Sequence, residues 1–217
     1  MARPRKSDDS KNALLQVGTQ MLTELGYHGT GIKPLLDRVG VPKGSFYNYF
    51  ESKEHFVASI IEQYGEVELR AFEADIVDLK QTPAMVQLWC SFQNRIERNL
   101  QANKSCACLL GAMAAEIASA SERCRLSIAQ VEAEWVKGLS HYIERAQQQG
   151  DFTTDESADE LARMLYNCWH GALLQYQVSN KHNDLLANLY VFFKLLLSPK
   201  GTQRFRQSDV CKREIEV

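Results

Sequence analysis

The stretch Gly29-Thr-Gly-Ile-Lys-Pro-Leu-Leu-Asp-Arg-Val-Gly-Val-Pro-Lys-Gly-Ser-Phe-Tyr-Asn-Tyr-Phe50 decides the fold of this 217-residue chain. Its first half places Leu35 and Leu36 on one side of a short predicted helix that ends at Gly40. Its second half places Phe46 and Phe50 four residues apart, and therefore on one face of a second short helix. Two short helices joined by a glycine-containing turn predict a helix-turn-helix.

Helical periodicity continues outward from this stretch in both directions. A preceding helix is predicted between the capping candidates Ser7 to Ser10 and a stop at Gly26, and its stripe consists of Leu14, Val17, Gly18, Met21, Leu22 and Leu25. Further helices are expected at residues 52–78, 82–103, 105–119, 121–149, 156–178 and 183–197. Because no segment shows the alternating, β-branched pattern of a strand, the predicted fold class is all-α.

The charge of the chain is divided unevenly along its length. The formal net charge is −2, but residues 1–60 contain eight Lys/Arg and six Asp/Glu, so the excess of positive charge lies at the front. The first residues lack the apolar core of a signal peptide, and no apolar run approaches the roughly 20 residues that span a bilayer. We therefore expect a cytoplasmic protein with no membrane partner.

The six cysteines do not form the pattern of a disulfide framework, and most are expected to be reduced and buried. The pair Cys106 and Cys108 lacks the spacing of a zinc knuckle, and none of the five histidines stands at a partnering distance. No phosphate-binding or other cofactor loop is present. The sequence predicts neither a metal site nor a cofactor.

The second short helix has the residue types that a DNA-reading helix needs. Phe46 and Phe50 would anchor it, because a helix this short is marginal in water when it stands alone. Gly44 would allow its amino end to approach a phosphate, and Lys43 would add a full positive charge. Ser45, Tyr47 and Asn48 face largely away from the anchors, where hydroxyl and amide groups can reach base edges.

The segment Lys43-Gly-Ser-Phe-Tyr-Asn-Tyr-Phe50, followed by Ser52-Lys53-Glu54, closely resembles the DNA-binding domain of the TetR family over about residues 8–60. The resemblance implies a transcriptional repressor that binds double-stranded operator DNA as a homodimer and leaves it when a small-molecule effector binds. Two residues depart from the common pattern: Pro42 replaces a Ser or Thr cap, and Asn48 stands where many relatives have Arg or His. The implied DNA-binding residues are Arg5, Thr30, Lys33, Lys43, Gly44, Ser45, Tyr47, Asn48, Tyr49 and Lys53.

The resemblance also implies the domain organisation: a DNA-binding domain at residues 1–53 and an effector-binding and dimerisation domain at 54–199. Residues 200–217 are polar and charged, so we expect them to form a loose tail. The last two long helices are the expected dimer surface, because their apolar stripes are wide enough for a four-helix bundle across a two-fold axis. Those stripes are Ala158, Leu161, Ala162, Leu165, Trp169, Ala172, Leu173 and Tyr176, then Leu185, Leu186, Leu189, Phe192, Phe193 and Leu196. The alternative is that both stripes form only the core of one chain.

The segment Ser105-Cys-Ala-Cys-Leu-Leu-Gly-Ala-Met-Ala-Ala-Glu-Ile117 resembles a branch of the family that includes the N-ethylmaleimide reductase repressor and an acrylate-responsive repressor. The effector implied is a reactive electrophile or an unsaturated small acid, and Cys108 at a helix start would favour thiolate. The alternative is that Cys108 is a packed core residue. The predicted effector site contains Trp89, Phe92, Cys108, Met113, Trp135, Tyr166, Trp169 and His170.

Other classes of protein compete with this interpretation. A helical thiol-dependent enzyme or redox protein could use Cys106 and Cys108, but no histidine is spaced to serve as their base. A helical scaffold would leave Lys43, Tyr47 and Lys53 without a role. An activator of the same family cannot be distinguished from a repressor by sequence. We therefore expect a DNA-binding regulator and not an enzyme.

Overall fold

The computed structural model describes residues 6–77, 82–101 and 109–208, and within these ranges the chain is helical, with one isolated antiparallel bridge between Phe152 and Leu197. The helices form two compact units. Unit 1 comprises residues 1–67 and 108–132, and unit 2 comprises residues 68–107 and 133–217. The all-α fold class is confirmed. No described helix is long and apolar enough to cross a membrane.

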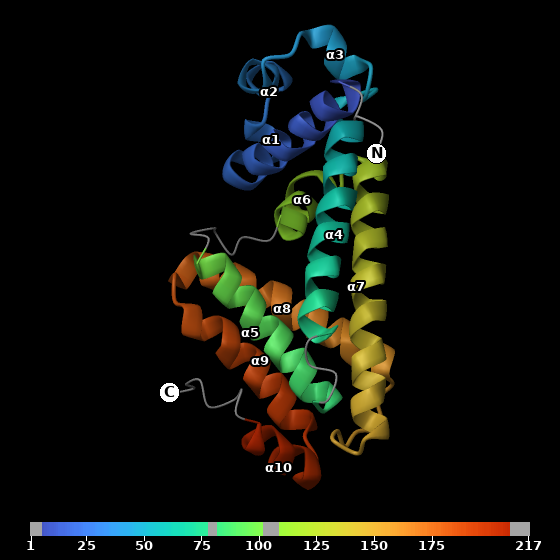
Figure 1. The fold of residues 1–217 in the computed structure, drawn as a ribbon, viewed down its shortest axis with the longest axis vertical. Coiled ribbons are helices and arrows are strands. Elements are labelled where there is room, and N and C mark those ends of the chain that lie inside the picture. The colour runs from blue at the N-terminus through green and yellow to red at the C-terminus, as the bar shows by residue number, and fades with distance from the viewer. Residues whose placement is uncertain (1–5, 78–81, 102–108, 209–217) are drawn as a thin grey trace. The chain divides into compact units, whose positions relative to one another are not determined.

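Unit 1 contains α1 (Lys6–Gly29), α2 (Ile32–Val39), α3 (Lys43–Tyr47) and α6 (Leu109–Ile117), together with the first parts of α4 (Lys53–Val77) and α7 (Glu122–Gln148) (Figure 1). The predicted stripe of α1 is buried at Leu14, Gly18, Met21 and Leu22, but Leu25 is exposed. A side chain at Gly18 would overlap the ring of Phe56. Glycine therefore lets α1 and α4 approach closely.

Unit 2 contains the rest of α4 and α7, and also α5 (Ala84–Gln101), α8 (Ala158–Ser179), α9 (His182–Leu196) and α10 (Pro199–Gln207) (Figure 1). A capping box between Ser157 and Glu160 starts α8, and Asn180 ends it in a left-handed conformation. Helices α8 and α9 pack against each other through the two stripes expected from the sequence. Their side chains form the core of a single chain.

The polar segment after Lys200 differs from the loose tail that the sequence predicts, because residues 199–207 form α10. Ser198 caps this helix by accepting a hydrogen bond from the backbone N–H of Gly201. Arg204 forms an ion pair with the buried carboxylate of Asp151, at 2.9 Å. Phe205 is buried, with its ring centroid 5.5 Å from that of Trp89. One apolar anchor and one ion pair hold a segment that is otherwise polar.

Candidate functional site

The turn between α2 and α3 has the geometry of a helix-turn-helix. Gly40 ends α2 with φ 73°, and its N–H donates to the carbonyl of Leu36. Such a left-handed conformation is one that glycine adopts without steric cost. Pro42 precedes α3 in an extended conformation and provides no side-chain cap, but its carbonyl accepts the N–H of Ser45 at 2.9 Å. Backbone bonds therefore fix the end of α2 and the start of α3 on either side of the short turn.

Helix α3 has only five residues, and an aromatic cluster holds it in place. Phe46, Phe50 and Phe56 are all buried, with ring centroids between 4.9 and 5.3 Å apart. Each burial removes a large apolar surface from water and is worth about 1.5–3 kcal/mol. Tilted and edge-to-face contacts among the rings add to this. The anchoring role predicted for Phe46 and Phe50 matches their positions.

The opposite side of α3 is open to solvent. Lys43, Gly44, Tyr47 and Asn48 are exposed, and Ser45 is half-buried. The side chain of Tyr47 is 49% exposed although it is a large aromatic residue, and the Lys43 ammonium lies 5.9 Å from its ring centroid. A partner could approach the backbone of Gly44, because a side chain there would meet nothing within 4 Å. Most of the predicted reading residues thus share one accessible side.

Other residues predicted to bind DNA have different surroundings in the structure. Thr30 is 2% exposed and donates its hydroxyl to the carbonyl of Gly26, so its side chain is not available to a phosphate. Lys53 donates to the carbonyl of Tyr27 at 2.6 Å, and its ammonium lies 3.9 Å from the Tyr27 ring centroid. Tyr49 is half-buried, Lys33 is exposed, and Arg5 lies outside the described residues. The sequence predicts a helix stop at Gly26, but it does not show that the carbonyl groups of Gly26 and Tyr27 become the partners of Thr30 and Lys53.

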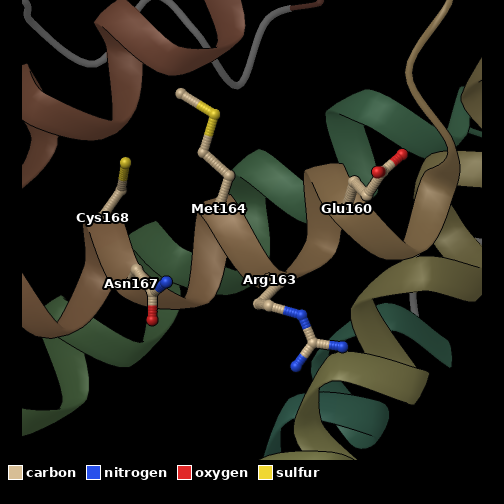
Figure 2. A pocket seen from close by; sticks show the side chains of 5 residues that line it. All are labelled: Glu160, Arg163, Met164, Asn167 and Cys168. Carbon is tan, nitrogen blue, oxygen red and sulfur yellow. The ribbon is translucent and has the colours of Figure 1, made fainter.

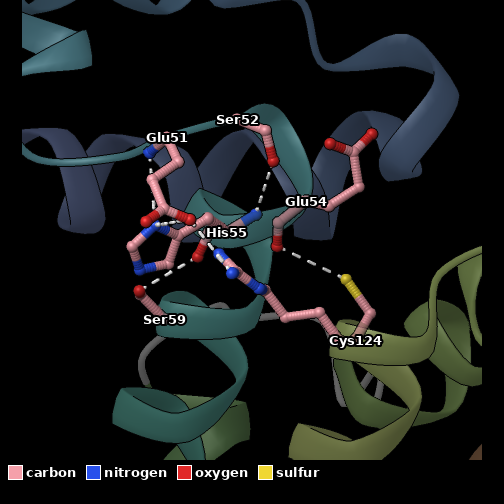
Figure 3. Close-up of polar contacts among 7 residues, drawn as sticks. Glu51, Ser52, Glu54, His55, Ser59 and Cys124 are labelled. Carbon is pink, nitrogen blue, oxygen red and sulfur yellow. Dashed lines mark hydrogen bonds and ion pairs between the residues drawn. The ribbon is translucent and has the colours of Figure 1, made fainter.

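A polar network joins the start of α4 to the start of α7 within unit 1 (Figure 3). The Ser52 hydroxyl accepts the N–H of His55 at 3.1 Å, and Glu51 forms an ion pair with Arg123 at 3.0 Å. Hydrogen bonds from its own backbone N–H, from Ser52 and from Tyr27 lower the pKa of Glu54. The charged form of Glu54 is therefore the one that the fold stabilises.

The structure brings part of the predicted effector site together in unit 2. The rings of Phe92 and Trp169 lie 5.1 Å apart, and the ring of Trp135 lies 5.2 Å from that of Phe72. The guanidinium carbon of Arg95 lies 5.2 Å from the Trp135 ring and 5.8 Å from the Trp169 ring. Helices α4, α5, α7 and α8 each contribute to this arrangement, which we call the Arg95 cluster.

Arg95 and Phe72 are the members of the Arg95 cluster that sequence reasoning missed. The Arg95 side chain is 12% exposed and forms an ion pair with Glu68 at 2.7 Å. A mostly buried guanidinium near two indole rings combines charge with aromatic contact. In the sequence, Arg95 stands among other charged residues of α5 and has no distinguishing pattern, although it follows Phe92 by three positions.

The remaining predicted effector residues lie elsewhere. Trp89 packs against Phe193 and Phe205, and its indole N–H is buried without a hydrogen-bond partner among the described residues. Tyr166 and His170 form a ring pair with centroids 4.1 Å apart. Met113 is buried in unit 1, and Cys108 lies outside the described residues.

An open depression of about 540 Å³ lies on the exposed side of α8 (Figure 2). Its lining consists of Glu160, Arg163, Met164, Asn167 and Cys168, all from this one helix. In Figure 2, Met164 and Cys168 project to one side of α8, and Arg163 projects to the other. None of the predicted effector residues lines it, so this depression is separate from the Arg95 cluster.

Two cysteines in the described ranges, Cys124 and Cys168, have thiols of raised pKa. Burial raises the pKa of Cys124, whose thiol donates to the carbonyl of Glu54 (Figure 3), and burial also raises the pKa of Cys168. A raised pKa reduces the thiolate that reacts with electrophiles. Cys106 and Cys108 lie outside the described residues. Within the described part of the chain, no group of three or more His, Cys, Asp or Glu side chains could hold a metal ion.

An aromatic-anchored one-turn helix, following a short helix and a tight turn, places this protein among the helix-turn-helix DNA-binding proteins. The family profile described as "Bacterial regulatory proteins, tetR family" matches residues 14–60, and the profile "Tetracyclin repressor-like, C-terminal domain" matches residues 83–189. The chain belongs to the TetR family of transcriptional regulators.

Individual members of the family are similar over most of their length. The transcriptional repressor DhaR of Mycobacterium sp. (strain GP1) is 29% identical over 85% of this chain and 90% of its own. The regulator AcuR of Cereibacter sphaeroides is 29% identical over 84% of each chain. The crystal structure of reduced Escherichia coli NemR superimposes with a TM-score of 0.77 and 26% identity, covering 88% of this chain and 97% of that one.

Tyr27→Phe should make the stability of the protein less sensitive to alkaline pH. Burial, followed by the hydrogen bond to Glu54, raises the pKa of Tyr27 to about 12, against an ordinary value near 10. The neutral phenol therefore contributes stability that is fully present below pH 10 and is lost as the pH rises towards 12. Urea unfolding between pH 8 and 11.5 should show a shallower decline in Tyr27→Phe than in the wild type. The exposed Tyr47→Phe serves as control, and equal slopes for Tyr27→Phe and wild type would contradict the assignment.

Proposed function

We propose that this protein is a dimeric transcriptional repressor that binds operator DNA through the exposed side of α3 and is released by a small-molecule effector. The single observation that carries the DNA-binding part is the two-sided character of α3. Its buried side is fixed by three phenylalanines, while Lys43, Gly44, Tyr47 and Asn48 are exposed together. A rigid helix with free hydroxyl, amide and ammonium groups suits the major groove. We place this activity in the cytoplasm, where bacterial operators lie.

Within this proposal the exposed residues have different tasks. Lys43 and Lys33 neutralise phosphates and position the protein, because their charge is not specific for any base. Ser45, Tyr47 and Asn48 read base edges. Thr30 and Lys53 act indirectly by holding the segment that leads into α2. Tyr49 is half-buried beside Phe50, and it supports the helix while presenting its edge to the backbone of the DNA.

Tyr47→Ala should abolish the preference for operator over random DNA, because it removes a reader and leaves the anchors intact. Lys43→Ala should instead weaken both kinds of DNA nearly equally and lower the slope of log affinity against log salt by about 1. Fluorescence anisotropy with an operator selected from random duplexes measures both effects. If Tyr47→Ala keeps the operator preference, Tyr47 is not a base-reading residue. If Lys43→Ala loses the preference, Lys43 does more than contact phosphate.

Regulators of this family act as dimers, and we propose that the dimer forms through the outer faces of α8 and α9. The stripes first expected to form it, including Leu189 and Phe193, are buried inside one chain. The opposite faces leave large apolar side chains exposed: Met164, Leu174 and Val178 on α8, and Val191 and Leu195 on α9. Val178 is 84% exposed and Leu195 is 73% exposed. An apolar patch of this kind marks an interaction surface.

Val191→Glu combined with Leu195→Glu should give a folded monomer. Both side chains are exposed in the single chain, so carboxylates there cost little until a second chain would bury them. Leu189→Glu with Phe193→Glu should instead unfold unit 2, because these positions are in its core. Sedimentation velocity and circular dichroism distinguish the two results, with the exposed Lys194→Glu as control. An undisturbed dimer in the first variant would place the interface elsewhere.

We also propose that the effector binds at the Arg95 cluster. The branch resemblance suggests a reactive electrophile or an unsaturated small acid, and the buried guanidinium favours the acid. A ligand carboxylate would take the place of Glu68 on Arg95, while the unsaturated part would lie against the indoles of Trp135 and Trp169. The exchange keeps the charge of Arg95 compensated, so the cost of disrupting its ion pair is offset. A neutral electrophile could not form an ion pair with the Arg95 guanidinium.

Acrylate, the simplest unsaturated acid, should release the wild-type protein from its operator, and Arg95→Gln should raise the half-release concentration at least tenfold. Cys108→Ser should respond to acrylate like the wild type, because the acid binds through the guanidinium. N-ethylmaleimide is the contrasting probe. If it releases the wild type but not Cys108→Ser, while acrylate has no effect on either protein, the effector is an electrophile sensed by Cys108 and the Arg95 assignment is wrong.

We propose a regulator and not a thiol-dependent enzyme. The relatives are transcriptional regulators, and the raised pKa of Cys124 and Cys168 opposes nucleophilic chemistry at these two positions.

A further inference from the structure

Helix α1 is interrupted at Gly26, one turn before its end. Gly26 has φ 70° and ψ −178°, a backbone conformation that is essentially restricted to glycine. The break leaves backbone groups on both sides of it without their helical partners. The hydroxyl of Thr30 donates to the Gly26 carbonyl at 2.7 Å, and the ammonium of Lys53 donates to the Tyr27 carbonyl at 2.6 Å. The Tyr27 carbonyl also accepts the backbone N–H of Thr30 at 3.3 Å, so side chains supply the partner of the Gly26 carbonyl and one of the two partners of the Tyr27 carbonyl.

The N–H groups after the break are satisfied by a carboxylate from a distant part of the sequence. Glu116 on α6 accepts hydrogen bonds from the backbone N–H of Tyr27 at 2.8 Å and of His28 at 3.3 Å. Its position is that of a capping side chain, but it comes from another helix, and an anion is favoured at the start of a helical turn. Both bonds are charge-assisted and therefore stronger than bonds between neutral groups.

Glycine at position 26 and glutamate at position 116 fit each other in shape. A side chain at residue 26 would overlap the Glu116 carboxylate, so glycine is required both by the backbone conformation and by the space that the carboxylate occupies. The charge of Glu116 also acts on Lys53. Burial lowers the pKa of Lys53, and the carboxylates of Glu54 and Glu116 offset part of that effect. One carboxylate thus joins α6 to the end of α1 by hydrogen bonds and acts electrostatically on the first residue of α4.

The turn that Glu116 caps is the one that leads into the helix-turn-helix. Residues 27–29 are followed by Thr30 and Gly31, and α2 begins at Ile32. Glu116 also belongs to the segment 105–117 that the sequence singled out, where it had no assigned role. We propose that Glu116 is a positioning residue for operator recognition: its carboxylate fixes the turn after Gly26 and with it the direction in which α2 and α3 are presented to DNA.

The proposal rests on the proposed DNA-binding function and predicts a loss of discrimination. Without the carboxylate, the turn at residues 27–29 can adopt several orientations, and only a fraction of the molecules present α3 correctly. Affinity for a specific site depends on that orientation, whereas contact of lysines with phosphates tolerates its loss. A purely structural role would lower the folded fraction and reduce binding to both kinds of DNA by the same factor.

Glu116→Ala should lower the ratio of operator to random-duplex affinity about tenfold, measured by anisotropy at a temperature where circular dichroism shows the variant to be folded. Glu116→Gln keeps an acceptor oxygen at the same reach and should recover part of the ratio. Glu122→Gln removes an exposed carboxylate from the same unit and should retain the wild-type ratio. Hydrogen exchange of the Tyr27 and His28 amides should be faster in Glu116→Ala than in the wild type.

A folded Glu116→Ala with the wild-type affinity ratio overturns the proposal, and so does an equal loss of affinity for both duplexes. If Glu116→Ala does not fold, Glu116→Asp decides by the same ratio, because its carboxylate is one methylene too short to reach both amides. The proposed function fails separately, if the wild type selects no sequence from random duplexes. In that case, unchanged exchange of the two amides in a folded Glu116→Ala, or in Glu116→Asp if Glu116→Ala does not fold, would still overturn the capping role.

Discussion

A helix of five residues has no stability of its own, and the surface that we propose for DNA contact is built on one. Its order comes from the contact of Phe46 and Phe50 with Phe56, which removes three rings from water. Phe56 in turn lies against Gly18, where only glycine allows α1 and α4 to come so near. Without this cluster the exposed side of α3 would have the same residues but no fixed arrangement.

The parts of the fold that could be predicted are those determined by local periodicity. The helix-turn-helix follows from Phe46, Phe50 and Gly40, whose spacing carries the information within a few residues. The hydrogen bond of Thr30 could not be predicted from the sequence, because it depends on the Gly26 carbonyl at the break in α1. In the sequence, such a break looks like an ordinary helix end. The expectation of a loose tail failed because one residue, Phe205, supplies the apolar contact that its neighbours lack.

The candidate effector region was less predictable for a related reason. Phe92, Trp135 and Trp169 are recognisable as large apolar residues, but their meeting requires three helices to pack, and Trp89 is equally apolar yet belongs to a different cluster. Arg95 could not be selected, since nothing in the sequence distinguishes a buried arginine from its exposed neighbour Arg98. Similarly, α8 has apolar residues on both faces, and only the packed chain shows which face it uses internally.

Helix α10 packs on a part of unit 2 that is synthesised long before it. Phe205 packs on Trp89, although it follows Trp89 by 116 residues in the sequence and is therefore synthesised much later. Unit 2 therefore cannot complete its core until residue 205 has been synthesised, and the growing polypeptide exposes parts of Trp89 and Phe193 before that point. Incomplete domains with such apolar surface are prone to aggregate and are typical clients of chaperones. A nascent chain that stalls before residue 205 would be a better substrate for quality control than the finished protein.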